Sequence, residues 1–258
     1  MVQLHPDPPF IFMKNNPERI AKVIARSGVC SRRNAEVLIS EGKVKVNGST
    51  ITEPGTKVSA EDTITVNGKP LRQAEKTRLW LFYKPKGTIT SSHDPQGRQT
   101  IFDLLPKAMP RVITIGRLDY NTEGLLLLTN DGELARTMEL PKNQVVREYR
   151  VRIFGKLYKD IIERLAAGVT VEGINYAGID AEPETSSKGS NTWIKVKLRE
   201  GKNREIRKVF SHFGLEVNRL IRVAYGSFAL ENLKLGEVRE VDQERVQQLK
   251  IDLTKASY

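Results

Sequence analysis

Cysteine, histidine and long apolar runs are scarce in this chain of 258 residues. Cys30 is the only cysteine, and the three histidines lie far apart in the sequence. A single cysteine cannot form a disulfide within the chain, and it excludes a cysteine-rich zinc site. No apolar run approaches the roughly 18 residues that a membrane-spanning helix needs. We therefore expect a cytoplasmic protein without a membrane partner, a metal or a disulfide framework.

Several common enzyme motifs are also missing. The chain has no Walker-type phosphate loop and no glycine-rich dinucleotide fingerprint. It also lacks the Gly-x-Ser-x-Gly elbow of serine hydrolases. These absences argue against the commonest nucleotide-hydrolysing, dinucleotide-dependent and serine-hydrolase classes.

Positive charge, by contrast, is in excess, with a formal net charge of +11. Residues 1–72 carry 11 basic and 7 acidic side chains, and residues 77–258 carry 30 and 23. An excess in both parts fits an extended polyanionic partner better than a small metabolite. On composition alone, two alternatives stay open: basic side chains that only solvate the surface, and an acidic membrane surface.

Two short helices and two strands are predicted in the first part of the chain. Pro17 can open one helix, and Ser31 is suited to cap the N-terminus of a second. The strands Val44–Val46 and Thr63–Val66 are each followed by Asn-Gly, which is typical of a tight hairpin turn. We predict a flexible tail over 1–16, a helix–turn–helix plus β unit over 17–72, and a linker over 73–78.

From Leu79 onward the pattern mixes strands with helices. The four leucines within Leu125–Thr129 predict a buried strand, and the alternation in Glu148–Phe154 and Thr192–Leu198 predicts half-buried strands. Helices are expected over 158–167 and 203–213. Many strands with few helices between them favour an α+β domain over 79–258, with a mixed, largely antiparallel sheet flanked by helices.

The segment from Gly116 to Gly124 is unusual because it places Arg117, Asp119 and Glu123 between two apolar strands. A carboxylate on such a loop is held rigidly and can still face a cleft. The residues alone leave two alternatives open. Asp119 could simply shape a turn, as short polar side chains often do. Asp119 and Glu123 together would suit a glycosidase or a nuclease.

A basic segment and one tyrosine are further candidates. Seven basic residues lie between positions 199 and 222, namely Arg199, Lys202, Arg204, Arg207, Lys208, Arg219 and Arg222. They predict either a solvated helix face or a phosphate-binding surface with one arginine turned towards a carboxylate. Tyr149 lies on an alternating strand. It is either a core aromatic or a ring at the core edge on which a nucleobase could stack.

Five segments of the second part resemble, in order, the motifs of the pseudouridine synthases, in the branch that contains RsuA, RluB, RluE and RluF. They are Lys84-Pro85-x-Gly87, Gly116-Arg117-Leu118-Asp119-x-x-Thr122-Glu123-Gly124-Leu125-Leu126, Glu148-Tyr149-Arg150-Val151, Gly201-Lys202-Asn203-Arg204-Glu205-Ile206-Arg207-Lys208 and Arg219-Leu220-Ile221-Arg222-Val223. The first part, over 19–48, resembles the small RNA-binding domain named after the fourth protein of the small ribosomal subunit. The finer match leans towards the RluB type, which acts on large-subunit ribosomal RNA.

The resemblance implies an enzyme that isomerises a specific uridine of ribosomal RNA, 23S rRNA or a precursor particle, without a cofactor or metal. It implies that Asp119 is the catalytic carboxylate, that Arg207 rather than Arg204 pairs with it, and that Tyr149 stacks on the target base. RNA contacts are expected from Arg32, Arg33, Lys43, Lys45, Lys84, Arg117, Lys202, Arg204, Lys208 and Arg222. We expect a monomer. The alternative is a non-catalytic RNA-binding ribosome-assembly protein.

Overall fold

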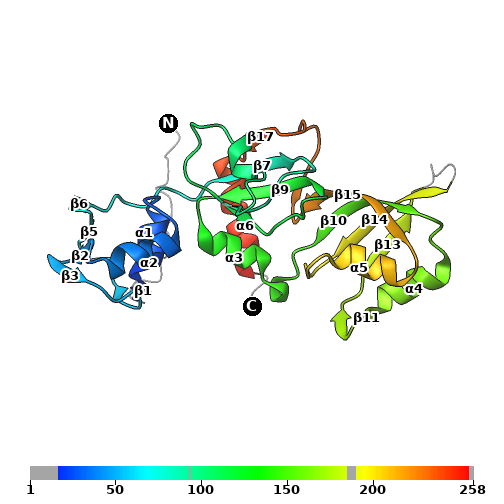
Figure 1. Cartoon of the computed structure of the whole chain (residues 1–258), viewed down its shortest axis with the longest axis horizontal. Helices are drawn as coiled ribbons and strands as arrows, with labels where there is room; N and C mark the ends of the chain where they lie inside the picture. Colours follow the sequence, from blue (N-terminus) through cyan, green and yellow to red (C-terminus); the bar gives the residue numbers. More distant parts are fainter. Residues whose placement is uncertain (1–16, 93, 185–189, 256–258) are drawn as a thin grey trace, which may run out of the picture. The chain divides into compact units, whose positions relative to one another are not determined.

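The computed structural model describes residues 17–92, 94–184 and 190–255, and these residues form two compact units (Figure 1). One unit ends at Lys76 and the other begins at Thr77, so the division falls inside the segment predicted to be a linker. The tail predicted over 1–16 lies outside the described residues.

The first unit combines two helices with small sheets. Its elements are β1 (Glu18–Arg19), α1 (Ile20–Arg26), α2 (Arg32–Ser40), β2 (Val44–Val46), β3 (Ser49–Ile51), β4 (Lys57–Val58), β5 (Ile64–Val66) and β6 (Lys69–Pro70). Strands β3, β2, β5 and β6 pair in that order, and β1 pairs with β4. Ile20, Ile24 and Ile39 of the helices are buried against Val44 and Val66 of the sheet.

Local signals set these elements. Ser31 Oγ accepts the N–H of Asn34 at 3.1 Å, which confirms Ser31 as the N-cap of α2. Asn47 and Gly48 have φ angles of 49° and 84°, as a type I′ turn between β2 and β3 requires. The first helix begins after the predicted position, at Ile20, because the two preceding residues pair with β4 as a short strand.

The second unit is built on one large sheet. Its elements are β7 (Leu79–Lys84), β8 (Ile113–Ile115), β9 (Glu123–Thr129), α3 (Gly132–Glu139), β10 (Arg147–Phe154), α4 (Lys159–Ala167), β11 (Val169–Val171), β12 (Ile174–Tyr176), β13 (Asp180–Pro183), β14 (Asn191–Leu198), α5 (Glu205–His212), β15 (Glu216–Tyr225), β16 (Phe228–Ala229), β17 (Val238–Glu240) and α6 (Gln243–Lys255), with 3-10 turns at Ile101–Leu104 and Pro141–Asn143. The main strand order is β13-β14-β10-β15-β9-β7-β17. The pairing is antiparallel except between β9 and β15, so the predicted mixed, largely antiparallel sheet is confirmed.

Apolar clusters hold the helices against this sheet. Leu125 and Leu127 of β9 belong to a cluster with residues of α3 and α6, whereas Leu126 and Leu128 belong to a cluster on the opposite face. The predicted buried strand is therefore confirmed, with both of its faces covered. Residues of α4 and α5 form a third cluster with β10, β14 and β15, and Figure 1 shows these two helices beside that half of the sheet.

Gly124 lies where the two halves of the sheet meet. The only parallel partners in the described sheet are Ile221 with Glu123 and Arg222 with Gly124. Gly124 has a φ angle of +110°, and a Cβ atom there would lie 2.3 Å from the carbonyl oxygen of Arg222. Two backbones approach this closely only when one residue has no side chain.

Replacing Gly124 with alanine is therefore expected to lower the free energy of unfolding by about 3 kcal/mol or more, because the sheet must separate beside the 116–122 loop. Urea unfolding followed by circular dichroism measures the change. Gly132→Ala in α3 is the control, since its Cβ would meet only Ile113 at an ordinary 3.8 Å. Equal effects of the two substitutions would show that the close approach at Gly124 is not what the sheet requires.

Candidate active site

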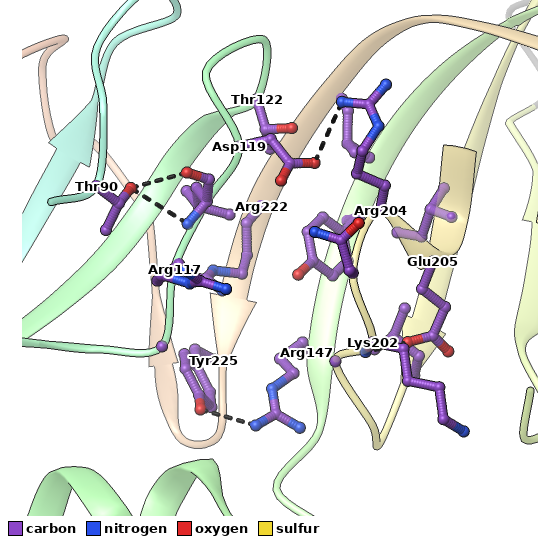
Figure 2. A pocket seen from close by; sticks show the side chains of 18 of the residues that line it. Thr90, Arg117, Asp119, Thr122, Arg147, Lys202, Arg204, Glu205, Arg222 and Tyr225 are labelled. Carbon is purple, nitrogen blue, oxygen red and sulfur yellow. Dashed lines mark hydrogen bonds and ion pairs between the residues drawn. The ribbon is translucent and has the colours of Figure 1, made fainter. Parts of the chain in front are cut away.

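The loop between β8 and β9, residues 116–122, is held by hydrogen bonds from surrounding elements. Glu139 Oε1, at the end of α3, accepts the N–H of Gly116 at 2.6 Å. Thr90 Oγ1 donates to the carbonyl of Leu118 at 2.8 Å and accepts the N–H of Leu118 at 3.3 Å (Figure 2). The N–H of Thr122 donates to the carbonyl of Asp119 at 3.0 Å, which closes a turn. The turn is thus a rigid support for the Asp119 side chain.

The carboxylate of Asp119 borders a cleft of about 800 Å³. Its side chain is 32% exposed, and Arg204 Nη1 lies 3.8 Å from its Oδ2 (Figure 2). Tyr149, Arg117 and Lys202 line the same cleft. The volume falls within the range of about 300–1,000 Å³ that is common for sites that bind small molecules. A charged carboxylate, a cation and an aromatic ring therefore meet in one accessible space.

The predicted pairing of Arg207 with Asp119 is wrong. Arg207 Nη1 donates to the carbonyl of Val217 at 2.8 Å, and its Nη2 donates to the carbonyl of Asn121 at 2.9 Å. Burial, and then the charge of Arg204, lower the pKa of Arg207, while the charge of Asp119 raises it. The charge of Asp119 therefore acts on Arg207 without a direct ion pair, and the hydrogen bonds of Arg207 hold the 116–122 loop against β15. The ion pair comes from Arg204, whose backbone is left-handed with a φ angle of 52°.

Lys84 lies inside the fold, so the prediction that it contacts RNA is wrong. Its side chain is fully buried, and its Nζ donates to the carbonyls of Pro85 at 3.0 Å, Asp119 at 3.2 Å and Thr122 at 2.9 Å. Burial lowers the pKa of Lys84 to about 8, against the opposing charges of Asp119 and Glu123. Lys84 thus joins β7 to both ends of the turn that carries Asp119.

Arg222 is also buried, beside Tyr225. The guanidinium groups of Arg147 and Arg222 lie 4.8 Å and 5.0 Å from the ring centre of Tyr225. Arg222 is 2% exposed and donates to the carbonyl of Leu125 at 2.7 Å, while its Nη2 has no hydrogen-bond partner among the described residues. Arg222 lines the cleft, so only RNA that enters the cleft would reach it, and the RNA contact predicted for it stays a prediction. Figure 2 shows Tyr225 and Arg147 at the opposite end of the cleft from Asp119.

The other predicted residues divide by position. Tyr149 is half-buried between two apolar clusters and lines the cleft, so it is a ring at the core edge. Lys208 is half-buried and does not line the cleft. In the first unit, the side chains of Arg32, Arg33, Lys43 and Lys45 are exposed.

Glu123, the second carboxylate of the motif, does not line the cleft. It is 9% exposed, and Arg219 Nε donates to its Oε1 at 2.6 Å. A glycosidase needs two carboxyl groups that face one substrate. Because the cleft holds Asp119 without Glu123, the arrangement does not support the paired-carboxylate alternative.

Sequence reasoning assigned no role to Thr90, Glu139 or Arg147, which also line the cleft. Arg147 Nη2 donates to Tyr225 Oη at 2.9 Å. Because Arg147 directly precedes the matched Glu148-Tyr149 motif, its position in the sequence could have indicated a place in the site. Thr90 and Glu139 reach the 116–122 loop only through the fold. No local pattern pointed to them.

Comparison with known proteins relates this arrangement of residues to a family of enzymes. A family model described as RNA pseudouridylate synthase matches residues 78–212, and the model of the S4 domain matches residues 18–64. This chain belongs to the RNA pseudouridylate synthase family. The synthase is 50% identical to an uncharacterized RNA pseudouridine synthase of Rickettsia felis, over 87% of this chain and 97% of that one. It is 41% identical to ribosomal large subunit pseudouridine synthase B of Bacillus subtilis, over 90% and 96% of the two chains.

A solved structure supports the fold of the synthase. The crystal structure of a pseudouridylate synthase superposes with a TM-score of 0.64 at 26% sequence identity, covering 90% of this chain and 99% of that one. The predicted order of an S4-type RNA-binding domain followed by a pseudouridine synthase fold is therefore confirmed. Within the described residues, none of the helices combines the length and apolar character needed to span a membrane.

Proposed function

We propose that this synthase isomerises one uridine of large-subunit ribosomal RNA to pseudouridine, with Asp119 as the catalytic carboxylate. The observation that carries the proposal is the Asp119 carboxylate on its held loop, facing the cleft beside Arg204 and Tyr149. Three relatives named ribosomal large subunit pseudouridine synthase B support the target. They come from Pseudomonas aeruginosa, Bacillus subtilis and Haemophilus influenzae and are 43%, 41% and 39% identical to this chain.

The reaction places definite demands on the site. The bond from N1 of uracil to C1′ of ribose breaks, the base turns, and C5 becomes bonded to C1′. The hydrogen on C5 leaves as a proton, and N1 gains one, so the product is an isomer. A carboxylate beside the ribose can bond to C1′, or it can remove a ribose proton. Both routes need a charged Asp119 next to the sugar, and Arg204 orients that carboxylate.

The remaining residues of the cleft suit an RNA substrate. The target uridine must leave its stack, at a cost of a few kcal/mol. The half-buried ring of Tyr149 offers a surface on which the flipped base stacks. Arg117, Lys202 and Arg204 are exposed at the cleft and contact neighbouring phosphates. Basic residues of the first unit add contacts that position the RNA without reading its sequence. We expect the synthase to act as a monomer in the cytoplasm.

A pseudouridine map of ribosomal RNA from a strain that lacks the gene tests this proposal. One modified position of large-subunit RNA is expected to revert to uridine, and the wild-type gene should restore it. A gene that encodes Asp119→Asn should not. Reversion in small-subunit RNA would contradict the proposed target. An unchanged map would favour the ribosome-assembly alternative over the proposed reaction.

A further inference from the structure

The segment that presents Arg204 to the cleft is held by two neighbouring carboxyl groups. Glu200 accepts hydrogen bonds from the N–H of Ala177 at 2.8 Å and from Lys202 Nζ at 2.5 Å. Glu205 Oε2 accepts the N–H of Lys202 at 2.9 Å. Glu205 therefore holds the backbone that leads into α5 at Lys202, and Glu200 joins the Lys202 side chain to the backbone of Ala177.

One oxygen of Glu205 has no donor when both carboxyl groups are charged. Glu205 is 3% exposed, and its Oε1 is buried without a hydrogen-bond partner among the described residues. The side chain of Glu200 nevertheless lies within hydrogen-bonding reach. Two carboxylates cannot bond to each other because both only accept, whereas a protonated carboxyl group donates. A proton on Glu205 Oε1 therefore converts an unsatisfied oxygen into a donor to Glu200.

The surrounding charges place this proton on Glu205 rather than on Glu200. Lys202 Nζ is directed to Glu200 and to the carbonyl of Asn175 at 2.7 Å, and it lies 5.5 Å from the ring centre of Tyr176. Burial, together with the negative charge of Glu200, raises the pKa of Glu205 to about 7, against the lowering effect of Lys202. Burial also opposes the charged form of Glu200, but hydrogen bonds from Lys202 and from a backbone N–H lower its pKa overall.

We propose that Glu205 is a positioning residue that acts as a neutral carboxylic acid and, by donating to Glu200, fixes the turn that brings Arg204 to Asp119. The inference rests on the proposed function, because it gives Arg204 and Asp119 their roles in the reaction. An arginine adopts the left-handed backbone seen at Arg204 only where its surroundings hold it there. Loss of the proton leaves two carboxylates side by side, and the turn relaxes.

Single-turnover rates of three full-length proteins test the proposal. The assay is tritium release from a large-subunit rRNA fragment labelled at C5 of uridine. The wild-type rate should fall above about pH 7, by up to about tenfold per pH unit as Glu205 loses its proton. Glu205→Gln keeps both an acceptor for Lys202 and a donor for Glu200, so it should match the wild-type rate near pH 6 and stay flat to about pH 8.5. Glu205→Ala should be at least about tenfold slower throughout.

Two outcomes of this assay would overturn the proposal. One is a Glu205→Gln rate that falls with pH in parallel with the wild type. The other is a Glu205→Ala rate equal to that of the wild type near pH 6. If Glu205 had a purely structural role, both Glu205→Gln and Glu205→Ala would lower the rate. The fall of the rate with rising pH would then persist in the Glu205→Gln protein.

Carbon-13 NMR of labelled glutamate carboxyl groups gives a readout that does not need catalysis. In the Asp119→Asn protein, one carboxyl group should titrate near pH 7, and this titration should vanish when Glu205→Gln is added. If every glutamate titrates well below pH 6, the role of Glu205 is refuted even in an active enzyme. Conversely, an active Asp119→Asn protein would refute the proposed function while leaving the Glu205 titration in place.

Discussion

Replacing Asp119 with asparagine is expected to reduce turnover by about 10⁴-fold or more, the size of loss that follows removal of an essential nucleophile or base. Asparagine keeps the shape of the side chain but has neither the negative charge nor the nucleophilic oxygen that both routes need. RNA affinity should stay within about twofold of the wild type, because phosphate contacts dominate affinity for nucleic acid. Tritium release and filter binding on the same RNA fragment measure the two quantities.

Glu123→Gln is the matched control, since it also neutralises a carboxylate of the motif. Glu123 is bonded to Arg219 and does not line the cleft, so its loss should lower turnover by less than about tenfold. Wild-type-like turnover by Asp119→Asn would refute the proposed role. The alternative of a glycosidase or nuclease that uses Asp119 with Glu123 would be supported by two results together. The two variants would be equally inactive, and the wild type would produce free uracil or cleaved strands.

The elements that could be predicted from the sequence are those whose signals are local. Ser31 caps α2 by accepting the N–H of Asn34, as its place before the helical pattern predicted. Asn-Gly turns follow β2 and β5. In each case a few adjacent residues determine the geometry, because a short polar side chain or a positive φ angle is required there. The four-leucine strand was equally clear from its apolar run.

Short strands at the sheet edges and the last helix escaped prediction. Strands β13 and β17 have four and three residues, so neither is long enough for an alternating pattern to show. Their pairing depends on partners far away in the chain, namely β14 and β7. Helix α6 was not predicted either, although Val246 and Leu249 bury one side of it against the sheet.

The choice between Arg204 and Arg207 failed for a geometric reason. The resemblance matched Arg207, rather than Arg204, to the basic residue that pairs with the catalytic aspartate, and a helix was expected from Asn203 onward. The helix instead begins at Glu205, and Arg204 precedes it in a left-handed conformation. Because successive helical residues differ by 100° around the axis, such a shift changes which side chain faces the cleft. Boundary residues of this kind depend on tertiary contacts that a single sequence does not display.

Lys84 illustrates the same limit for burial. Lys84 was among the basic residues expected to contact RNA, and a lysine is almost never fully buried unless it is paired. The structure pairs it with three backbone carbonyls around the turn of Asp119. Nothing in the Lys84-Pro85-Lys86 stretch distinguishes the internal lysine from the exposed one at position 86.

Replacing Lys84 with methionine is expected to lower turnover at saturating RNA by about 100-fold, because the turn of Asp119 loses its anchor. Methionine fills a similar volume but leaves the three carbonyl oxygens without this donor, and each unsatisfied group costs about 1–3 kcal/mol when buried. RNA affinity should change by less than about threefold. Lys86→Met is the control, since it removes an exposed charge two positions away and should leave turnover at saturating RNA within about twofold of the wild type.

The pH dependence of stability separates the two roles of Lys84 further. Because the pKa of Lys84 is about 8 in the folded protein and 10.5 in the unfolded chain, the unfolded chain binds more protons between these values. The free energy of unfolding of the wild type should therefore rise, relative to Lys84→Met, as the pH increases from about 8 to above 10. Lys86→Met should follow the wild type. A Lys84→Met protein with weakened RNA binding, a reduced salt dependence and no change in this pH profile would restore Lys84 as a phosphate contact.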